Sequence, residues 1–255
     1  MTRVCVAGVT GWVGRPLAAA IQEGQDLQLA AAVSRRARGE RLGNVTISGS
    51  VAEALQTPFD VLVDYTSAAA VKGHVLAAVE AKRHVVVGSS GLTDSDFAQI
   101  DSAARGVAVG VIAVGNFAIS AALLQRFAVE AARHMPSWEI VDYADAAKID
   151  APSGMARQLA WRLGQVRSPE VGVAPEDTVG IVESRGALLD GSPVHSLRLP
   201  GHTIGLEVIF GRPDERLRIH YDGGPGAGPY IQGTLLAIRR VSEIRGVLRG
   251  LDPLL

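Results

Sequence analysis

The sequence has one cysteine, few aromatic residues and no excess of either charge. Cys5 stands alone in an apolar run, so a disulfide within the chain is excluded and a cytoplasmic location is expected. The formal net charge of −1 excludes a general attraction to nucleic acid or anionic membranes, and neither is expected as a partner. No apolar run reaches the ~20 residues of a membrane helix. Because the six histidines lack metal-ligand spacing, no metal site is expected.

The first half of the chain alternates apolar runs with helix-like segments. Strands are expected at residues 3–7, 27–33, 59–63, 84–87 and 107–114. Helices are expected at residues 12–22, 68–81 and 94–104, the last of them capped by Thr93. Strands that are apolar throughout and alternate with helices predict a doubly wound parallel sheet in an α/β domain.

The second half has more consecutive strands. Helices are expected at residues 119–134, 153–163 and 230–241, and strands at 138–143, 178–184, 194–199, 204–210 and 216–220. Consecutive strands separated by turn residues predict a second α+β domain on a mixed, largely antiparallel sheet. The first domain is expected to span residues 1–116, completed by 226–255, and the second to span 117–225.

A glycine-rich turn follows the first expected strand and opens the first expected helix. The spacing G-x-x-G-x-x-G, from Gly8 to Gly14, lets the backbone turn tightly and approach a pyrophosphate at a helix N-terminus. This loop is expected to bind a dinucleotide through Gly8, Thr10, Gly11, Trp12 and Val13. The alternative is a tight strand-to-helix turn that holds no ligand.

Ser34, Arg35 and Arg36 follow the second expected strand. A carboxylate at this place would bind an unphosphorylated ribose, whereas two arginines suit a 2′-phosphate. We therefore expect NADPH as the cofactor, with NADH as the alternative. A solvated basic loop is the competing interpretation of these residues.

Small polar residues follow two later strands. Thr66 comes after one, and Gly88, Ser89 and Ser90 come after the next. Since the carboxyl ends of parallel strands line the ligand crevice, these residues are expected near the nicotinamide ribose. The alternative is a pair of ordinary strand-to-helix turns.

The segment Lys148-Ile149-Asp150-Ala151-Pro152-Ser153-Gly154, called here the lysine loop, has the composition of an anion-binding loop. A cation precedes a Pro-Ser-Gly turn, and a helix follows. Lys148, Ser153 and the backbone of Gly154 are expected to hold a carboxylate of a small-molecule substrate. The alternative for Lys148 is a surface salt bridge with Asp150.

Together these motifs resemble the dihydrodipicolinate reductase family of lysine biosynthesis. The resemblance is carried by the glycine loop, by Gly88 to Gly91, by Gly115-Asn116-Phe117, by segments 195–201, 207–211 and 236–241, and above all by the lysine loop. It implies a Rossmann domain, a mixed-sheet domain that often forms homotetramers, and hydride transfer to a cyclic imine dicarboxylate. It also adds Asn116 and Phe117 to the expected cofactor site and Met155 to the expected substrate site.

The segment that precedes Lys148 departs from the family pattern at two adjacent positions. The family carries adjacent histidines there, one of them the proton donor, and the corresponding residues are Ala144 and Asp145. Lys148 is then the best candidate for the proton donor, because partial desolvation can lower the pKa of a lysine. Tyr143 and Asp145 are further catalytic candidates, although in an extended segment they share one face and Lys148 lies on the other. The alternatives are an edge residue at the domain junction for Tyr143 and a solvated carboxylate for Asp145.

Three functions fit this pattern. The favoured one is an NAD(P)H-dependent reductase acting on an altered cyclic imine or related unsaturated substrate, because loss of cationic groups weakens binding of a dicarboxylate. The second is the lysine-pathway reaction with a changed proton donor. The third is a non-catalytic NADPH sensor, which would leave the lysine loop unexplained.

Overall fold

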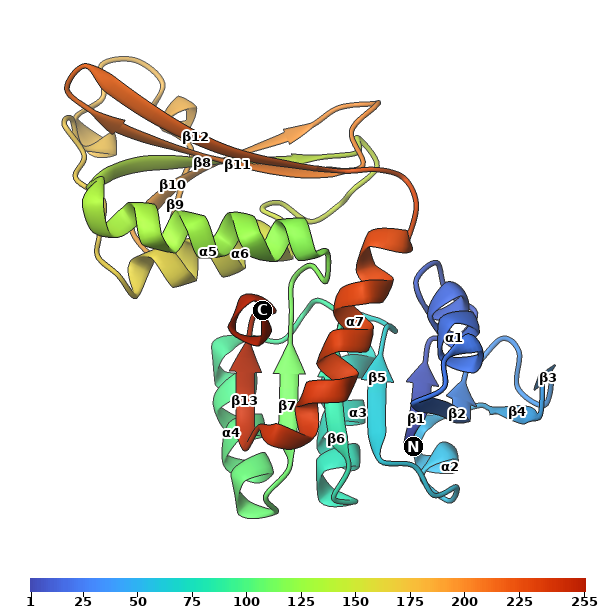
Figure 1. Cartoon of the computed structure of the whole chain (residues 1–255). Coiled ribbons are helices and arrows are strands. Elements are labelled where there is room, and N and C mark those ends of the chain that lie inside the picture. Colours follow the sequence, from blue (N-terminus) through green and yellow to red (C-terminus); the bar gives the residue numbers. More distant parts are fainter. The chain divides into compact units, whose positions relative to one another are not determined.

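The chain folds into two compact units, and the computed structural model describes all of residues 1–255 (Figure 1). The first unit comprises Met1–Ile119 and Ala227–Leu255, and the second comprises Ser120–Gly226. The predicted fold class is confirmed, because one unit has a parallel sheet covered on both faces and the other has a mixed, largely antiparallel sheet.

A parallel sheet organises the first unit. Its strands lie in the order β13-β7-β6-β5-β1-β2-β4-β3, and only the β3–β4 pair is antiparallel. The strands are β1 (Thr2–Ala7), β2 (Leu27–Val33), β3 (Arg41–Leu42), β4 (Val45–Ser48), β5 (Val61–Asp64), β6 (His84–Val87), β7 (Gly110–Ala113) and β13 (Gly246–Arg249). Central strands β5 and β7 are buried along their whole length, because helices cover both of their faces.

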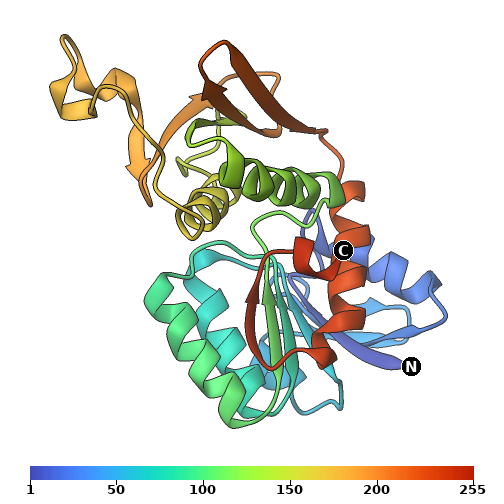
Figure 2. The ribbon, with the colours of Figure 1, turned by 60° about the vertical axis from the view of Figure 1, so that its left-hand side comes forward.

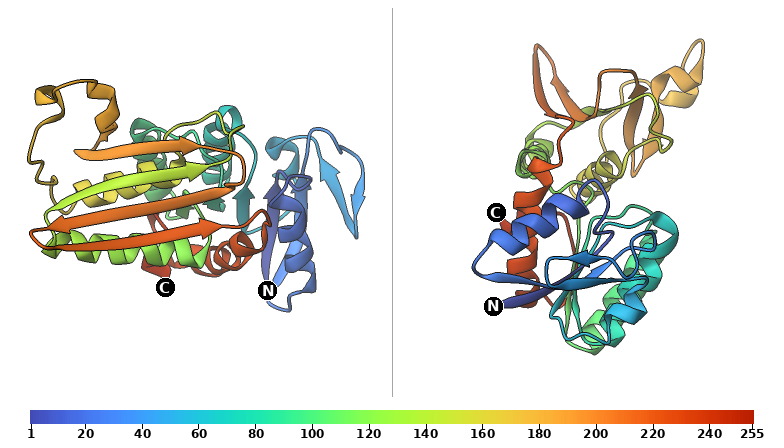
Figure 3. Two further views of the ribbon diagram at one scale, coloured as in Figure 1. Left: turned by 90° about the horizontal axis from the view of Figure 1, so that it is seen from above. Right: turned by 90° about the vertical axis from the view of Figure 1, so that its right-hand side faces the viewer.

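The helices of this unit form a layer on each side of the sheet (Figure 3). One layer contains α1 (Gly14–Glu23) and α7 (Gly228–Arg240), and the other contains α2 (Val51–Ala54), α3 (Ala68–Glu80) and α4 (Asp94–Gly106). Thr93 caps α4 as predicted, since its Oγ1 accepts the Asp96 N–H at 3.2 Å. The chain returns to this unit through α7 and β13, and β13 pairs in parallel with β7 (Figure 2).

A five-stranded sheet organises the second unit, in the order β12-β11-β8-β10-β9. Its elements are α5 (Ile119–His134), β8 (Ser137–Ala144), α6 (Gly154–Gly164), β9 (Ala187–Leu189), β10 (Ser192–Arg198), β11 (Ile204–Arg212) and β12 (Glu215–Gly223). Strand β8 pairs in parallel with β10 and antiparallel with β11. Helices α5 and α6 cover one face of this sheet (Figure 3). Burial alternates along β8, so Ile140, Asp142 and Ala144 lie on the covered face, whereas Tyr143 lies on the other face.

The strand predicted at residues 178–184 is wrong. This stretch is irregular and leads into a 3₁₀ turn at Val182–Arg185. Gly180 has φ of +119°, which lies outside the β region, and Val179 and Ile181 are exposed. The β-branched residues that suggested a strand have no neighbouring strand to pair with.

Candidate active site

The glycine loop joins β1 to α1 and depends on two close backbone approaches. Gly8 has φ of +86°, and a Cβ there would run into the carbonyl oxygen of Tyr65. A Cβ at Gly14 would run into the carbonyl of Gly8. The Gly11 N–H donates to the Gly8 carbonyl at 2.8 Å, which closes the turn. These contacts explain why the loop needs glycine at its first and last positions.

The N-terminus of α1 is suited to an anion. Its first turn has no side-chain cap and no acidic residue. Pro16 has no N–H, and the Arg15 and Leu17 N–H groups donate to the carbonyls of Gly11 and Val13 at 3.1 and 3.0 Å, so the Gly14 N–H and the helix dipole are what this end offers to a phosphate. The loop and the helix end together have the form of a pyrophosphate cradle, so the residues present fit a dinucleotide.

Ser34, Arg35 and Arg36, which were expected to select NADPH, follow β2 and lie beside the glycine loop. The Thr10 and Ser34 hydroxyls are 2.8 Å apart, which ties the glycine loop to the end of β2. Arg35 and Arg36 are exposed, and neither forms an ion pair within the chain. Nearby Arg38 pairs with Glu53 at 3.4 Å. Trp12 is 54% exposed and packs edge-on against Tyr230 of α7, with ring centroids 5.3 Å apart.

Thr66 and Ser89 meet at a buried carboxylate that was not predicted from the sequence. Asp64, the last residue of β5, accepts the Thr66 hydroxyl at 2.8 Å and the Ser89 hydroxyl at 2.6 Å on Oδ1. Its Oδ2 lies 2.8 Å from Nδ1 of His74 on α3. The sequence placed Asp64 directly after the strand expected at residues 59–63, and His74 within the helix expected at residues 68–81. Only their spacing of ten residues across the β5–α3 turn could have indicated contact.

The neighbouring glycine and aromatic residues support this turn. A Cβ at Gly88 would run into the ring of Tyr65, so glycine is required there. The Tyr65 hydroxyl lies 2.6 Å from that of Thr234 on α7, and burial raises the pKa of Tyr65. Phe117 is buried against Tyr65, with centroids 5.9 Å apart. Ser90, in contrast, is exposed.

Asn116 and Phe117 are both buried in the first unit. Asn116 Oδ1 accepts the Ala118 N–H at 2.8 Å and so shapes the turn before α5. Phe117 is 1% exposed. Its side chain is therefore part of the core, and any contribution to a ligand site would come from its backbone.

In the second unit, Lys148 is held within its own loop. Its Nζ lies 2.6 Å from Asp150 Oδ1, so the salt bridge that the sequence offered as the alternative for Lys148 is present. Burial alone would raise the pKa of Asp150, but the hydrogen bond and charge of Lys148 outweigh it and lower that pKa. The side chain of Lys148 remains 30% exposed and is accessible to a ligand.

The Pro-Ser-Gly turn begins α6 as predicted. Ser153 is buried, and its Oγ accepts the Ala156 N–H at 3.3 Å as the N-cap. Gly154 is half-buried, with open space where a Cβ would point. Met155 is only 1% exposed, so its side chain is a core residue of α6.

A buried ion pair holds the lysine loop to the sheet and was not predicted from the sequence. Asp142 Oδ2 accepts Arg198 Nη2 at 2.8 Å and the Ser153 N–H at 2.8 Å. Arg198 Nη2 also donates to the Asp150 carbonyl at 2.7 Å. Asp142 is fully buried, and the Arg198 side chain is 16% exposed. Two strands thus fix both ends of the Asp150–Ser153 turn.

The structure does not bring the other catalytic candidates to Lys148. The Tyr143 hydroxyl donates to Glu207 Oε2 at 2.9 Å across the strand pair. Partial burial, followed by the hydrogen bond and charge of Glu207, raises the pKa of Tyr143. Asp145 is exposed and accepts the Ala147 N–H at 2.8 Å in a local turn. The side chains of Tyr143 and Asp145 make no hydrogen bond or ion pair with Lys148.

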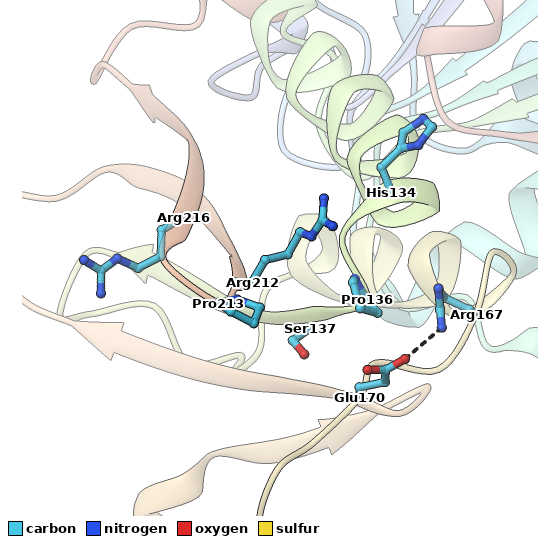
Figure 4. Close-up of a pocket in the computed structure, with 9 residues that line it drawn as sticks. His134, Pro136, Ser137, Arg167, Glu170, Arg212, Pro213 and Arg216 are labelled. Carbon is cyan, nitrogen blue, oxygen red and sulfur yellow. Dashed lines mark hydrogen bonds and ion pairs between the residues drawn. The ribbon is translucent and has the colours of Figure 1, made fainter.

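A separate basic hollow lies at the other end of the second sheet (Figure 4). It has a volume of about 670 Å³, and its lining residues include Arg167, Arg212, Arg216 and His134. Arg167 is paired with Glu170 at 3.2 Å. None of the predicted site residues lines this hollow. The chain has no group of three or more His, Cys, Asp or Glu residues placed to hold a metal, and none of its helices is long and apolar enough to span a membrane.

Comparison with known proteins covers the whole chain. A family model described as dihydrodipicolinate reductase, N-terminus, matches residues 2–117, and one described as dihydrodipicolinate reductase, C-terminus, matches residues 120–255. The 4-hydroxy-tetrahydrodipicolinate reductase of Desulfitobacterium hafniense is 35% identical over 263 residues, which cover 99% of this chain and 98% of the relative. That of Nocardia farcinica is 36% identical over 259 residues, with coverage of 99% and 98%.

Solved structures show the same similarity. The dipicolinate-bound dihydrodipicolinate reductase from Paenisporosarcina sp. TG-14 is 27% identical, with a TM-score of 0.81 and coverage of 100% of both chains. An amine dehydrogenase from Mycobacterium smegmatis shares the fold, with 15% identity, a TM-score of 0.66 and coverage of 98% of this chain and 95% of that one.

A parallel sheet with a glycine loop at its first turn, joined to a domain with a cationic loop, defines the class of NAD(P)H-dependent reductases. Within this class, the chain belongs to the dihydrodipicolinate reductase family, because both family models and full-length relatives match it. The resemblance inferred from the motifs is thereby confirmed.

Proposed function

We propose that this protein reduces a cyclic imine or related unsaturated acid with hydride from NADPH. The observation that carries the proposal is the lysine loop, a cation-bearing turn that two strands hold in place, in a family of dinucleotide-dependent reductases. When bound, the cofactor supplies the hydride. The protein binds and orients both reactants and provides a proton.

The expected cofactor contacts remain part of this proposal. We assign the pyrophosphate to the glycine loop (Gly8, Thr10, Gly11, Trp12 and Val13) and the nicotinamide half to Thr66, Gly88, Ser89, Ser90 and the backbone around Asn116 and Phe117. The uncapped end of α1 and the requirement for glycine at Gly8 support the first assignment.

The preference for NADPH over NADH is assigned to Ser34, Arg35 and Arg36. Both guanidinium groups are exposed and unpaired, whereas Arg38 is engaged with Glu53. Replacing Arg35 and Arg36 with Ala should weaken NADPH binding at least about tenfold and leave NADH nearly unchanged, since each lost charge-assisted contact is worth ~1.5–3 kcal/mol. Titration of both cofactors by fluorescence measures this effect, with Arg38→Ala as the matched control. Equal weakening of the two cofactors would contradict the assignment.

The substrate is assigned to the lysine loop. Lys148, Ser153 and the backbone of Gly154 and Met155 would hold one carboxylate, and Lys148 Nζ is the proposed proton donor. Lys148 must then exchange or share its bond with Asp150 when the substrate binds. Arg198 is not free to bind a second carboxylate, because it is committed to Asp142 and the Asp150 carbonyl.

Lys148 is thus the one cationic side chain that we assign to the substrate, which supports a substrate less anionic than that of the lysine-pathway enzyme. The positions of the family's histidine pair are occupied by Ala144, which is fully buried, and by the carboxylate of Asp145. Assaying NADPH oxidation with 4-hydroxy-tetrahydrodipicolinate and with a panel of monocarboxylate cyclic imines tests this proposal. Faster turnover of the dicarboxylate would assign the lysine-pathway reaction. Tight NADPH binding without turnover of any compound would favour the sensor.

We also propose a cytoplasmic homotetramer that assembles through the second sheet. Helices α5 and α6 cover one face of this sheet (Figure 3), and the other face presents Leu197, Tyr143 and Ile209. The single cysteine is buried, so the assembly would not depend on disulfides.

A further inference from the structure

The hydroxyl groups of Thr66 and Ser89 have their protons committed to one buried carboxylate. Asp64 is an acceptor when ionised, so the Thr66 and Ser89 hydroxyls must both donate to its Oδ1, at 2.8 and 2.6 Å. Ser89 Oγ also accepts the Thr66 N–H at 2.7 Å. What each hydroxyl still offers to a ligand is a lone pair and not a proton.

His74 completes the arrangement from the other side. Its Nδ1 donates to Asp64 Oδ2 at 2.8 Å, and it must donate in either charge state because the carboxylate has no proton to give. Asp64 is fully buried, whereas the side chain of His74 is 25% exposed. The carboxylate thus has donors on both oxygens, and His74 is the donor on Oδ2.

The two hydroxyls lie where a ligand can reach them. Thr66 is exposed and Ser89 is half-buried, and they follow adjacent strands β5 and β6 at the carboxyl edge of the sheet. A pair of acceptors at this edge fits a ligand that carries several donors close together. The hydroxyl groups of a ribose and the amide of a nicotinamide are such donors.

We propose that Asp64 and His74 are positioning residues that make Thr66 and Ser89 hydrogen-bond acceptors for the nicotinamide-riboside half of the cofactor. This inference rests on the proposed function, since it requires that the protein binds a nicotinamide dinucleotide. If Asp64 were protonated, it could no longer accept both hydroxyl protons, and either Thr66 or Ser89 would turn its O–H toward the ligand. Two hydrogen-bond donors would then face each other, which would weaken binding of the cofactor.

The charge state of Asp64 follows from its neighbours. Burial would raise its pKa, but the hydrogen bonds from His74, Ser89 and Thr66 outweigh burial and lower the pKa below its ordinary value. Cys5 on β1 also faces Asp64, and its thiol stays neutral because burial and the Asp64 charge raise its pKa. Removing His74 takes away a lowering influence, so the pKa of Asp64 should rise and the acid limit of NADPH affinity should move to higher pH.

Calorimetric titration of NADPH across pH 4.5–8 tests the proposal with three variants. His74→Phe removes the donor, His74→Asn places an amide near the position of Nδ1, and His134→Phe is the matched control on the exposed face of α5. A rise of one unit in the pKa of Asp64 weakens NADPH binding by at most about tenfold, so we expect the Kd for NADPH of His74→Phe to increase toward pH 4.5 more steeply than that of the wild type. His74→Asn should recover most of this affinity, and His134→Phe should bind as the wild type does.

A second ligand separates positioning from general damage. Adenosine 2′,5′-bisphosphate lacks the nicotinamide riboside, so its affinity should be unchanged in His74→Phe at every pH. Equal loss of affinity for both ligands, or an unchanged NADPH pH profile, would overturn the inference. Failure of the wild-type protein to bind NADPH at all would instead reject the proposed function.

Discussion

At the scale of single residues, Lys148 is the side chain on which the proposed chemistry depends most. It is partly exposed and paired with Asp150, so it is positioned before any substrate arrives. Replacing Lys148 with Met should lower kcat/KM about 10²–10⁴-fold while leaving NADPH affinity intact, because a proton donor and an anion contact are lost together. Steady-state kinetics and NADPH titration measure the two effects. Lys82→Ala, at an exposed turn, is the control, and unchanged turnover in Lys148→Met would remove this residue from the mechanism.

Ala144 and Asp145, which stand where the family carries its histidine pair, should respond differently to substitution. Asp145 is exposed, so Asp145→His should fold normally and improve kcat/KM on the dicarboxylate substrate by removing a repelling charge. Ala144 is fully buried, so Ala144→His would overpack the core at a cost of about 1–3 kcal/mol. Thermal melts and kinetics of both variants measure this contrast. A slower Asp145→His enzyme would argue against repulsion by Asp145.

Sequence reasoning identified the motifs at this scale but missed the groups that hold them. The glycine loop and the lysine loop are contiguous, so their spacing is visible in the chain. Asp64 and His74 meet because the short turn between β5 and α3 brings the end of the strand beside the helix. Asp142 and Arg198 lie 56 residues apart in the chain and meet because β8 and β10 are neighbours in the sheet. Such contacts depend on strand register, which composition does not reveal. For the same reason the burial of Phe117 and Met155 was not foreseen.

At the scale of elements, the Asp142–Arg198 pair connects two strands to the lysine loop. Arg198→Met would leave the carboxylate of Asp142 buried without its cation, which should lower the free energy of unfolding by about 3–5 kcal/mol. It should also raise KM for the substrate, since the Asp150 carbonyl loses its donor. Chemical denaturation and kinetics measure both effects. Arg185→Met, which removes a more distant ion pair to Glu139 at 3.8 Å, is the control. A stable Arg198→Met variant with normal KM would contradict this role.

Long periodic elements and the short apolar strands of the first sheet's centre (β5, β6 and β7) were predictable, and the other short or irregular elements were not. The helix expected at residues 119–134 has the same bounds as α5, and the strand at 27–33 has the bounds of β2. In contrast, α2, β3, β4, β9 and β13 each have two to four residues, too few to show a period. The stretch at 178–184 has strand-like composition but no strand beside it, so local propensity gave a wrong result.

At the scale of the whole molecule, the open face of the second sheet predicts self-association. Leu197 lies on this face, whereas Leu217 lies on the face that carries the helices. Leu197→Arg should dissociate the proposed tetramer and Leu217→Arg should not, because only the first places a charge in the proposed interface. Sedimentation velocity of the wild type and both variants measures this outcome. A monomeric wild-type protein would reject the tetramer.

The two units follow from the change of pattern along the chain, which the sequence shows near residues 115–116. The structure divides the chain at Ile119 and again at Gly226. From the sequence, the last segment is expected to return to the first domain, with residues 226–255 completing that domain after a glycine-rich stretch at residues 223–228. The parallel pairing of β13 with β7 is the contact by which the last segment joins the first sheet.

This return has a consequence for how the protein is made. Tyr65 bonds to Thr234, 169 residues later, and β13 pairs with β7 more than a hundred residues after it. During synthesis, β8 to β12 all leave the ribosome before α7 and β13 do. The second unit can therefore mature first, while the first unit waits with one helix and one strand missing. The exposed edge of its sheet is the part of the nascent chain that most needs protection from aggregation.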